Sequence, residues 1–224
     1  MLVYGKNVLH EVAKDKIKKV YISRKEYISY LHENNIKYDI VDNNVINKMV
    51  KGNHQGIVMD IFDYDYYDLN DVEGSLVVML DHLTDTHNFG AIIRTCECIG
   101  VKYIIIPKDR SVNVNDTVYK TSVGAINNVK IVMVSNLKNA LDKLKDKGYF
   151  IYTADMDGQN YKKINYAPKK VLVIGNEGDG VSNIIRDNSD VIVSLPMVGK
   201  INSLNASVSA GILLYEMGTY EKSN

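Results

Sequence analysis

The chain has 224 residues, of which 46% are hydrophobic and 24% are charged. These proportions are typical of a globular protein that forms one large domain or a small domain beside a larger one. Lys plus Arg and Asp plus Glu both total 27, so the formal net charge is zero and a generally basic nucleic-acid-binding protein is excluded. Any nucleic-acid partner must be held by a local basic patch.

The two cysteines, Cys96 and Cys98, stand two residues apart in a helix-like run, so they point to different sides and cannot easily bridge or share a metal ion. No other cysteine completes a zinc set and the five histidines are scattered, so we predict no metal site. The N-terminal residues lack the apolar core of a signal peptide, and no run approaches about 18 apolar residues. We therefore expect a cytoplasmic protein with reduced thiols.

Residues 1–65 alternate short strands and helices and predict a compact α/β domain. The predicted strands are 19–23, 38–41 and 56–61, and the predicted helices are 25–34 and 44–50. Residues 1–62 hold ten Lys or Arg and seven Asp or Glu, a difference of +3, with cations clustered at Lys14, Lys16, Lys18, Lys19, Arg24 and Lys25. Because a charge run is usually a solvated face, both an RNA contact and an ordinary surface stay open.

An acidic and aromatic segment without a regular period follows this domain. Residues 63–71 read Asp-Tyr-Asp-Tyr-Tyr-Asp-Leu-Asn-Asp. We interpret it as a linker or an edge segment and place the domain boundary here, with a linker over 66–74 and a second domain over 75–224.

The second domain has longer apolar runs separated by helix-like segments. The predicted strands are 76–80, 103–106, 129–134, 149–153, 171–174 and 191–195, and the predicted helices are 91–99, 137–147 and 206–216. Strands that are apolar on both faces and alternate with helices predict an α/β fold with a parallel sheet. Ligands of such sheets bind beyond the carboxyl ends of the strands.

Three polar loops follow strands of this sheet, at 85–90, 175–180 and 195–205. In the first loop, Asn88 either caps the next helix or belongs to a functional site. Arg94 is expected about one turn into that helix, where a cation opposes the helix dipole by roughly 0.3–1 kcal/mol unless an anion compensates it. The alternative is that Arg94 is a solvated surface residue.

The second loop has three glycines, which let the backbone approach a ligand closely. It matches neither the Lys-containing phosphate loop nor the dinucleotide fingerprint. The plain alternative is a tight loop in which Glu177 bonds backbone amides. In the third loop, Asn202, Ser203 and Asn205 supply more hydrogen-bonding capacity than one helix cap needs. Three such loops at strand ends of one domain predict a site.

Taken in this order, the three loops resemble the motifs of the SpoU (TrmH) family of RNA ribose 2′-O-methyltransferases. The resembling segments are 88–94, 174–182 and 195–205, and residues 120–125 resemble a stretch between the first two motifs. Residues 3–9 and 54–58 resemble the L30e-like substrate-binding domain of the family. The long form with that domain is most similar to members that methylate a guanosine of 23S ribosomal RNA in the large subunit.

The resemblance implies a fold that the periodicity does not show. In this family the C-terminal part of the α/β domain forms a deep trefoil knot, an exception to the usual topology rules. The knot forms the S-adenosylmethionine pocket, and the enzymes are homodimers through the knotted domain. The small residues Ala206, Ser209 and Ala210 suit close packing there.

The resemblance also implies the site residues. The candidate catalytic residues are Asn88, Arg94, Glu177, Ser203 and Asn205. The candidate S-adenosylmethionine-binding residues are Thr153, Gly175, Asn176, Gly178, Leu195, Met197, Ser203 and Leu204. The candidate RNA-binding residues are Lys18, Lys19, Arg24 and Arg94, and no metal is implied.

The implied reaction is in-line transfer of a methyl group from a sulfonium to a ribose 2′-hydroxyl, which mainly requires positioning and removal of a proton. Arg94 is the family's suggested base. Because a guanidinium group rarely gives up its proton, we favour Arg94 as a clamp on the phosphate beside the target ribose. Ser203 and Asn205 then orient the hydroxyl, and Glu177 fixes the glycine loop. Cations of the first domain are expected to contact RNA phosphates.

Two alternatives stay open. The first is another substrate within the same class, a transfer RNA or the ribosomal RNA targeted by antibiotic-resistance enzymes. The second is a catalytically silent RNA-binding protein on the same fold. That alternative predicts eroded motifs, yet all five candidate catalytic residues are present.

Overall fold

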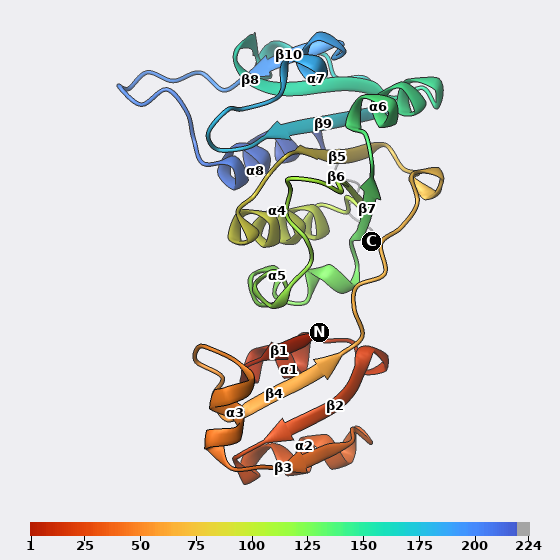
Figure 1. Cartoon of the computed structure of the whole chain (residues 1–224). Coiled ribbons are helices and arrows are strands. Elements are labelled where there is room, and N and C mark those ends of the chain that lie inside the picture. The colour runs from red at the N-terminus through yellow and green to blue at the C-terminus, as the bar shows by residue number, and fades with distance from the viewer. Residues whose placement is uncertain (219–224) are drawn as a thin grey trace, which may run out of the picture.

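The computed structural model describes residues 1–218, which form two α/β units stacked end to end (Figure 1). The last six residues of the predicted second domain, 219–224, lie outside the described residues. The N-terminal unit lies below the larger C-terminal unit in the view of Figure 1.

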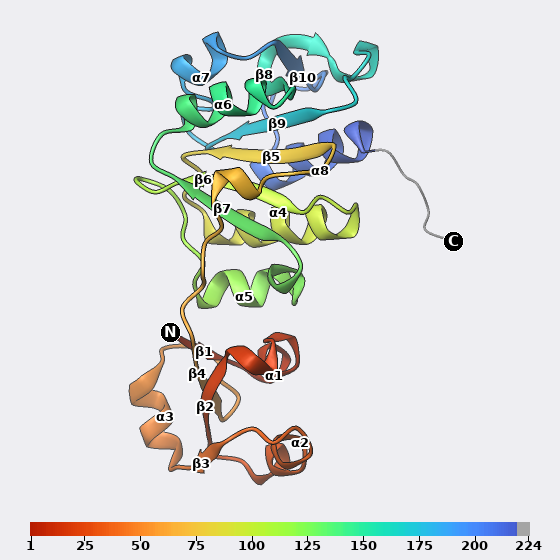
Figure 2. The ribbon, with the colours of Figure 1, turned by 90° about the vertical axis from the view of Figure 1, so that its right-hand side faces the viewer.

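The N-terminal unit is a four-stranded sheet in the order β1-β4-β2-β3. Its strands are β1 (Leu2–Tyr4), β2 (Ile17–Ile22), β3 (Tyr38–Ile40) and β4 (Ile57–Ile61). Only β2 and β3 pair in parallel. Figure 2 shows α1 (Lys6–Glu11) and α2 (Ile28–Glu33) on one face of the sheet and α3 (Asn43–Met49) on the other.

Alternation of side chains across these strands produces the core of the unit. Val3, Met59 and Val20 lie opposite one another in the register of β1, β4 and β2, and all three are fully buried. The three predicted strands and two predicted helices are confirmed, with shifted ends. The helix predicted from residue 25 starts as a 3₁₀ turn, Lys25–Tyr27, and becomes an α-helix at Ile28. β1 and α1 were not predicted.

The C-terminal unit is built on a six-stranded sheet in the order β10-β8-β9-β5-β6-β7. Every pairing in it is parallel, as the apolar runs predict. Its strands are β5 (Leu76–Asp81), β6 (Tyr103–Pro107), β7 (Lys130–Val134), β8 (Phe150–Asn160), β9 (Lys170–Gly175) and β10 (Val191–Ser194). All residues of β5 and β9 are buried because helices cover both faces of the sheet.

One face of this sheet packs on α4 (Thr86–Cys98) and α8 (Ala206–Met217), and α5 (Asp116–Ser122) packs on α4. The other face packs on α6 (Leu137–Asp146) and α7 (Asn183–Asp187) (Figure 2). The predicted helices at 137–147 and 206–216 are confirmed. The helix predicted over 91–99 begins five residues earlier, at Thr86, and α5 and α7 were not predicted.

The strand predicted over 149–153 is seven residues longer at its C-terminal end, because β8 follows a shifted register with β10. The shift falls between Ile192 and Val193. Gly158 fits this crossing, since a Cβ there would meet the carbonyl carbon of Ile192 at 2.6 Å. The sequence pattern did not reveal this extension.

The segment between the units is hydrogen-bonded to the larger unit along β7. The hydroxyl of Tyr64 accepts from the N–H of Ile131 (3.0 Å) and donates to the carbonyl of Val129 (3.3 Å). The hydroxyl of Tyr66 accepts from the N–H of Val114 (3.0 Å). Tyr67 forms a parallel bridge with Val132 at the outer edge of the sheet. Residues 64–67 therefore form a strap, and the predicted linker starts inside it.

Helix α8 returns from the edge of the sheet to its middle. After β10 the chain runs through 195–205 and then packs α8 against α4 and β9. The α/β class with a small N-terminal unit and a parallel sheet is confirmed, while the trefoil knot stays a prediction.

Candidate functional site

The three predicted loops lie at one edge of the parallel sheet. They follow β5 at Asp81, β9 at Gly175 and β10 at Ser194, and all three strands run in the same direction. A cavity of about 810 Å³ opens at this edge. Its walls come from residues 174–180, from 193–197 and 202–204, from the extension of β8 at 154–158 and 160, and from Ala206, Ser209 and Leu213 of α8. The position agrees with the rule for parallel sheets.

The glycine loop after β9 closes on itself. A Cβ on Gly175 would meet the carbonyl carbon of Gly180 at 2.1 Å, so only glycine fits there. The side chain of Asn176 accepts from the N–H groups of Gly178 (2.8 Å) and Asp179 (2.7 Å). The N–H of Asn176 bonds the carbonyl of Gly180. The loop is thus preformed, and the hydrogen bonds of Asn176 within the loop hold its shape.

Glu177 projects from this loop toward the first one. Its Oε1 accepts from the side-chain amide of Asn88 over 2.6 Å, and Asn88 is buried. The interpretation of Asn88 as the cap of α4 is wrong, because Asp85 accepts from the N–H groups of His87 (2.6 Å) and Asn88 (3.1 Å). The alternative in which Glu177 bonds backbone amides is also not observed, since Asn176 does this instead.

The third loop supplies cavity residues and the cap of α8. Asn202 and Ser203 line the cavity. Asn205 caps α8, with its Oδ1 accepting from the N–H and the hydroxyl of Ser207 (2.9 and 2.6 Å). Asn205 does not line the cavity within this chain, so capping already explains its presence.

Arg94 lies outside the cavity within this chain. It is the ninth residue of the thirteen in α4, so the expectation that it opposes the helix dipole is wrong: the helix begins at Thr86, and Arg94 is in its C-terminal half. Its side chain is exposed and its charge acts on Glu11 of α1. Burial raises the pKa of Glu11, and the nearby Arg94 lowers it by a smaller amount.

The structure brings together seven of the eight predicted cofactor-binding residues. Gly175, Asn176, Gly178, Leu195, Met197, Ser203 and Leu204 all line the cavity. The exception is Thr153, whose fully buried hydroxyl bonds Ser189 (2.5 Å) while its neighbour Ala154 lines the cavity. Sequence reasoning missed Asp155 and Asp157, although Asp-Met-Asp-Gly directly follows a predicted strand and could have been treated as a fourth loop.

The cavity is acidic. Asp155, Asp157, Glu177 and Asp179 line it, and no Lys, Arg or His does so among residues 1–218. Asp155 is paired with Arg186 of α7 (2.5 Å), which leaves most of the negative charge uncompensated. Such a cavity favours a ligand that carries positive charge and disfavours a bound phosphate.

The predicted RNA-binding cations of the N-terminal unit have carboxylate neighbours. Lys18 lies 3.9 Å from Asp60, Lys19 lies 2.5 Å from Asp39, and Arg24 lies 4.0 Å from Glu26. The hydrogen bond that Lys19 donates to Asp39 raises the pKa of Lys19. These exposed pairs contribute little stability, and a polyanion can compete for such cations. The RNA contact stays a prediction.

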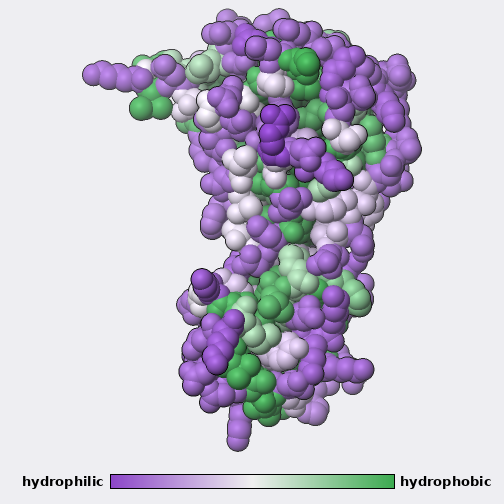
Figure 3. All heavy atoms as spheres, in the orientation of Figure 1, coloured by the Kyte–Doolittle hydropathy of each residue, from purple (hydrophilic) through white to green (hydrophobic). Residues whose placement is uncertain are grey.

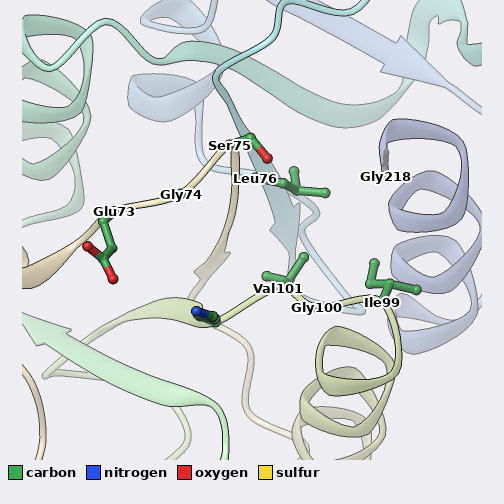
Figure 4. Close-up of a pocket in the computed structure, with 9 residues that line it drawn as sticks. Glu73, Gly74, Ser75, Leu76, Ile99, Gly100, Val101 and Gly218 are labelled. Atoms are coloured by element: carbon green, nitrogen blue, oxygen red, sulfur yellow. The ribbon is translucent and has the colours of Figure 1, made fainter. Parts of the chain in front are cut away.

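A second cavity of about 510 Å³ lies near the amino end of β5 (Figure 4). It is lined by Glu73, Ser75, Val101 and their neighbours, and none of the predicted site residues is there. Within residues 1–218 no cluster of His, Cys, Asp or Glu is suited to a metal ion, and no helix is long and apolar enough to cross a membrane.

The fold and the loops define a two-domain α/β protein with a preformed ligand site at the carboxyl edge of a parallel sheet. The model of the SpoU rRNA Methylase family matches residues 75–215, and the model for RNA 2′-O ribose methyltransferase substrate binding matches residues 2–67. The chain therefore belongs to the SpoU methylase family of RNA methyltransferases, as the motifs predict.

Individual relatives agree with this membership. YacO of Bacillus subtilis (strain 168), named for the TrmH family of tRNA/rRNA methyltransferases, is 34% identical over 99% of this chain and 96% of its own. The SpoU methyltransferase AviRb from Streptomyces viridochromogenes shares the fold with a TM-score of 0.82 at 22% identity, covering 97% of this chain and 88% of AviRb. An AdoMet-bound rRNA methyltransferase from Sinorhizobium meliloti shares the fold with a TM-score of 0.80 at 24% identity, covering 96% of this chain and 85% of the chain in that structure.

Proposed function

We propose that this chain uses S-adenosylmethionine to methylate a ribose 2′-hydroxyl of RNA, and that the target is a guanosine of 23S ribosomal RNA. The observation that carries the proposal is the contact between Asn88 and Glu177, which joins two family motifs at the rim of an acidic cavity. The match of residues 2–67 to a substrate-binding model named for 2′-O ribose methyltransferases supports the choice of the ribose hydroxyl.

The residues around the cavity fit S-adenosylmethionine. This cofactor carries a sulfonium and an ammonium group, which suit the carboxylates of Asp157, Glu177 and Asp179. Leu195, Met197 and Leu204 offer apolar surface for an adenine, and backbone groups of the glycine loop offer hydrogen bonds. When bound, the cofactor supplies an electrophilic methyl group. The cofactor-bound state of the Sinorhizobium meliloti structure, which has the same fold, supports this assignment.

The protein's own residues position the ribose. Ser203 faces the cavity and can hydrogen-bond a hydroxyl group. The amide nitrogen of Asn205 has no role in the cap of α8, so it can donate to the same sugar. Glu177 is held by Asn88 at the rim, where it keeps the loop in place. Most of the rate enhancement then comes from orientation.

The phosphate beside the target ribose needs a cation that this cavity lacks, so we assign Arg94 to this role from a second copy of the chain. The loop 195–205 supports a homodimer because it exposes apolar side chains: Val198 is fully exposed and Ile201 is 75% exposed. Figure 3 shows apolar atoms on this protruding loop, at the upper left of the molecule. Val208 of α8, 48% exposed, extends the surface. The assignment requires that a dimer burying this surface bring one copy's α4 near the other's cavity.

The test is methylation of purified RNA with labelled S-adenosylmethionine, followed by mapping of 2′-O-methyl nucleotides. Ribosomal RNA from cells that lack this protein should gain one 2′-O-methylguanosine, and the Arg94→Ala variant should add none. A methyl group on transfer RNA alone would replace the proposed substrate by the tRNA alternative, which the 33% identical tRNA-modifying enzyme from A. aeolicus makes the second candidate. A protein that binds RNA but transfers no methyl group would be the silent alternative.

A further inference from the structure

Asp81, the last residue of β5, is a buried carboxylate without a role in the proposed reaction. Its side chain is 1% exposed. Its Oδ2 accepts from the N–H of Ser182 over 2.7 Å, and its Oδ1 lies 2.5 Å from Nδ1 of His82. A carboxylate is costly to bury unless hydrogen bonds replace its water. Here the two partners come from the segments that follow β5 and β9.

The contact with Ser182 fixes the far end of the glycine loop. Ser182 lies two residues after this loop and is the N-cap residue of α7, where its carbonyl accepts from the N–H of Arg186 (2.9 Å). Arg186 in turn holds Asp155 in the cavity wall. The near end is fixed by the sheet, since Asp81 and Gly175 are register partners in β5 and β9. Asp81 thus contacts both ends of the glycine loop, through its carboxylate at Ser182 and through the sheet at Gly175.

The contact with His82 fixes the first loop to the same point. His82 has a φ of 56°, in the left-handed region that residues other than glycine seldom adopt. In this backbone conformation, Nδ1 of the His82 ring lies within hydrogen-bond distance of Oδ1 of Asp81. The chain then reaches Asp85, which caps α4 and so sets the position of Asn88. Asp81 therefore connects both sides of the contact between Asn88 and Glu177.

We infer that Asp81 is a positioning residue for the methyl-transfer site: it holds the glycine loop in its binding shape by accepting hydrogen bonds, and its negative charge is not required. The inference rests on the proposed function, since the shape it maintains is that of the S-adenosylmethionine cavity. It predicts that the loop loses its order when the acceptor is removed, even before any ligand is added.

Two substitutions distinguish the role of Asp81 as a hydrogen-bond acceptor from the role of its negative charge. Asp81→Asn keeps an oxygen for the N–H of Ser182 and places an amide beside the His82 ring. Asp81→Ala removes both contacts. The matched control is Asp68→Ala, which removes a carboxylate that caps the 3₁₀ turn Leu69–Asp71 by accepting from Asn70 (2.7 Å) and that does not line the cavity.

The first measurement is hydrogen exchange of the peptide covering residues 175–183 in the protein without ligand, and the second is calorimetric titration with S-adenosylmethionine. We expect Asp81→Ala to speed exchange in this peptide and to weaken binding by about tenfold or more, the factor that one hydrogen bond to a charged group commonly contributes. Asp81→Asn should stay within about twofold of the wild type. Asp68→Ala should alter neither measurement.

Wild-type exchange and affinity in Asp81→Ala would overturn the inference, and so would an Asp81→Asn variant that behaves like Asp81→Ala. If Asp81→Ala does not fold, Ser182→Pro takes its place, because it deletes the donated N–H at a residue whose φ of −61° suits proline. Faster exchange of the loop in that variant supports the inference, and unchanged exchange contradicts it. A wild type that ignores S-adenosylmethionine refutes the proposed function, while the exchange comparison still decides the role of Asp81.

Discussion

Replacing Gly175 by Ala tests whether the glycine loop is as closed as the structure has it. The added methyl carbon would stand 2.1 Å from the carbonyl carbon of Gly180 and 2.4 Å from the nitrogen of Val181. Ordinary contacts of a Cβ begin at 3.4 Å, so the far side of the loop must move by about 1.3 Å. Overpacking of this kind costs about 1–3 kcal/mol of folding free energy. For a chain of this size, that cost lowers the Tm by about 2–12 °C.

The same displacement should impair the site, because Asn176 and Glu177 lie between the two colliding segments. A misplacement of about 1 Å can reduce turnover by about 100-fold. Thermal melting, calorimetry with S-adenosylmethionine and a methylation assay measure the three effects. The matched control for folding is Gly178→Ala in the same loop, whose Cβ would have only the Asn176 Oδ1 nearby, at 3.6 Å. If Gly175→Ala melted at the same temperature as Gly178→Ala, the closed loop would be wrong.

Three further predictions concern the arginine, the N-terminal unit and the buried phenols. Arg94→Ala should abolish turnover and leave S-adenosylmethionine affinity nearly unchanged, because Arg94 does not line the cavity; loss of cofactor binding would refute the assignment. Deleting residues 1–62, with the strap retained, should spare cofactor binding and remove RNA methylation, and normal methylation by the truncated protein would contradict this division of work. Burial raises the pKa of Tyr64 and raises the pKa of Tyr166 to about 12, so the unfolded chain loses these protons first and stability should fall as pH rises from about 10 toward 12. Tyr64→Phe should flatten that fall in Tm, and an unchanged slope would argue against the burial of this phenol.

The parallel sheet and the position of the site could be predicted because they follow from local pattern. Runs such as Val77-Val78-Met79-Leu80 are apolar on both faces, which specifies a strand covered by helices. Glycine and amide residues directly after such runs then specify where a ligand binds. The resemblance to the family motifs then identified the individual site residues. Seven of the eight residues proposed to bind the cofactor line one cavity.

The missed features depend on contacts between distant segments. Asp85 caps α4 because its carboxylate accepts from two backbone N–H groups. The side chain of Asn88 instead donates to Glu177, 89 residues away in the sequence. The extension of β8 depends on the register that β10 adopts, 36 residues further along. The sequence does not show that residues 64–67 form a strap, because their tyrosines look irregular in sequence, yet the hydroxyls of Tyr64 and Tyr66 hydrogen-bond backbone groups of the next domain. No local period encodes such pairings.

The strap has a consequence for substrate choice. A flexible tether would let the N-terminal unit search a large volume around the sheet, so that many separations between recognised and methylated nucleotides would be tolerated. Tyr64 and Tyr66 instead dock the connection, and the ring of Tyr4 meets the ammonium of Lys120 across the two units. If the N-terminal unit binds the RNA as proposed, this docked connection restricts methylation to RNAs whose recognised feature and target sugar are already folded at the separation between the two units.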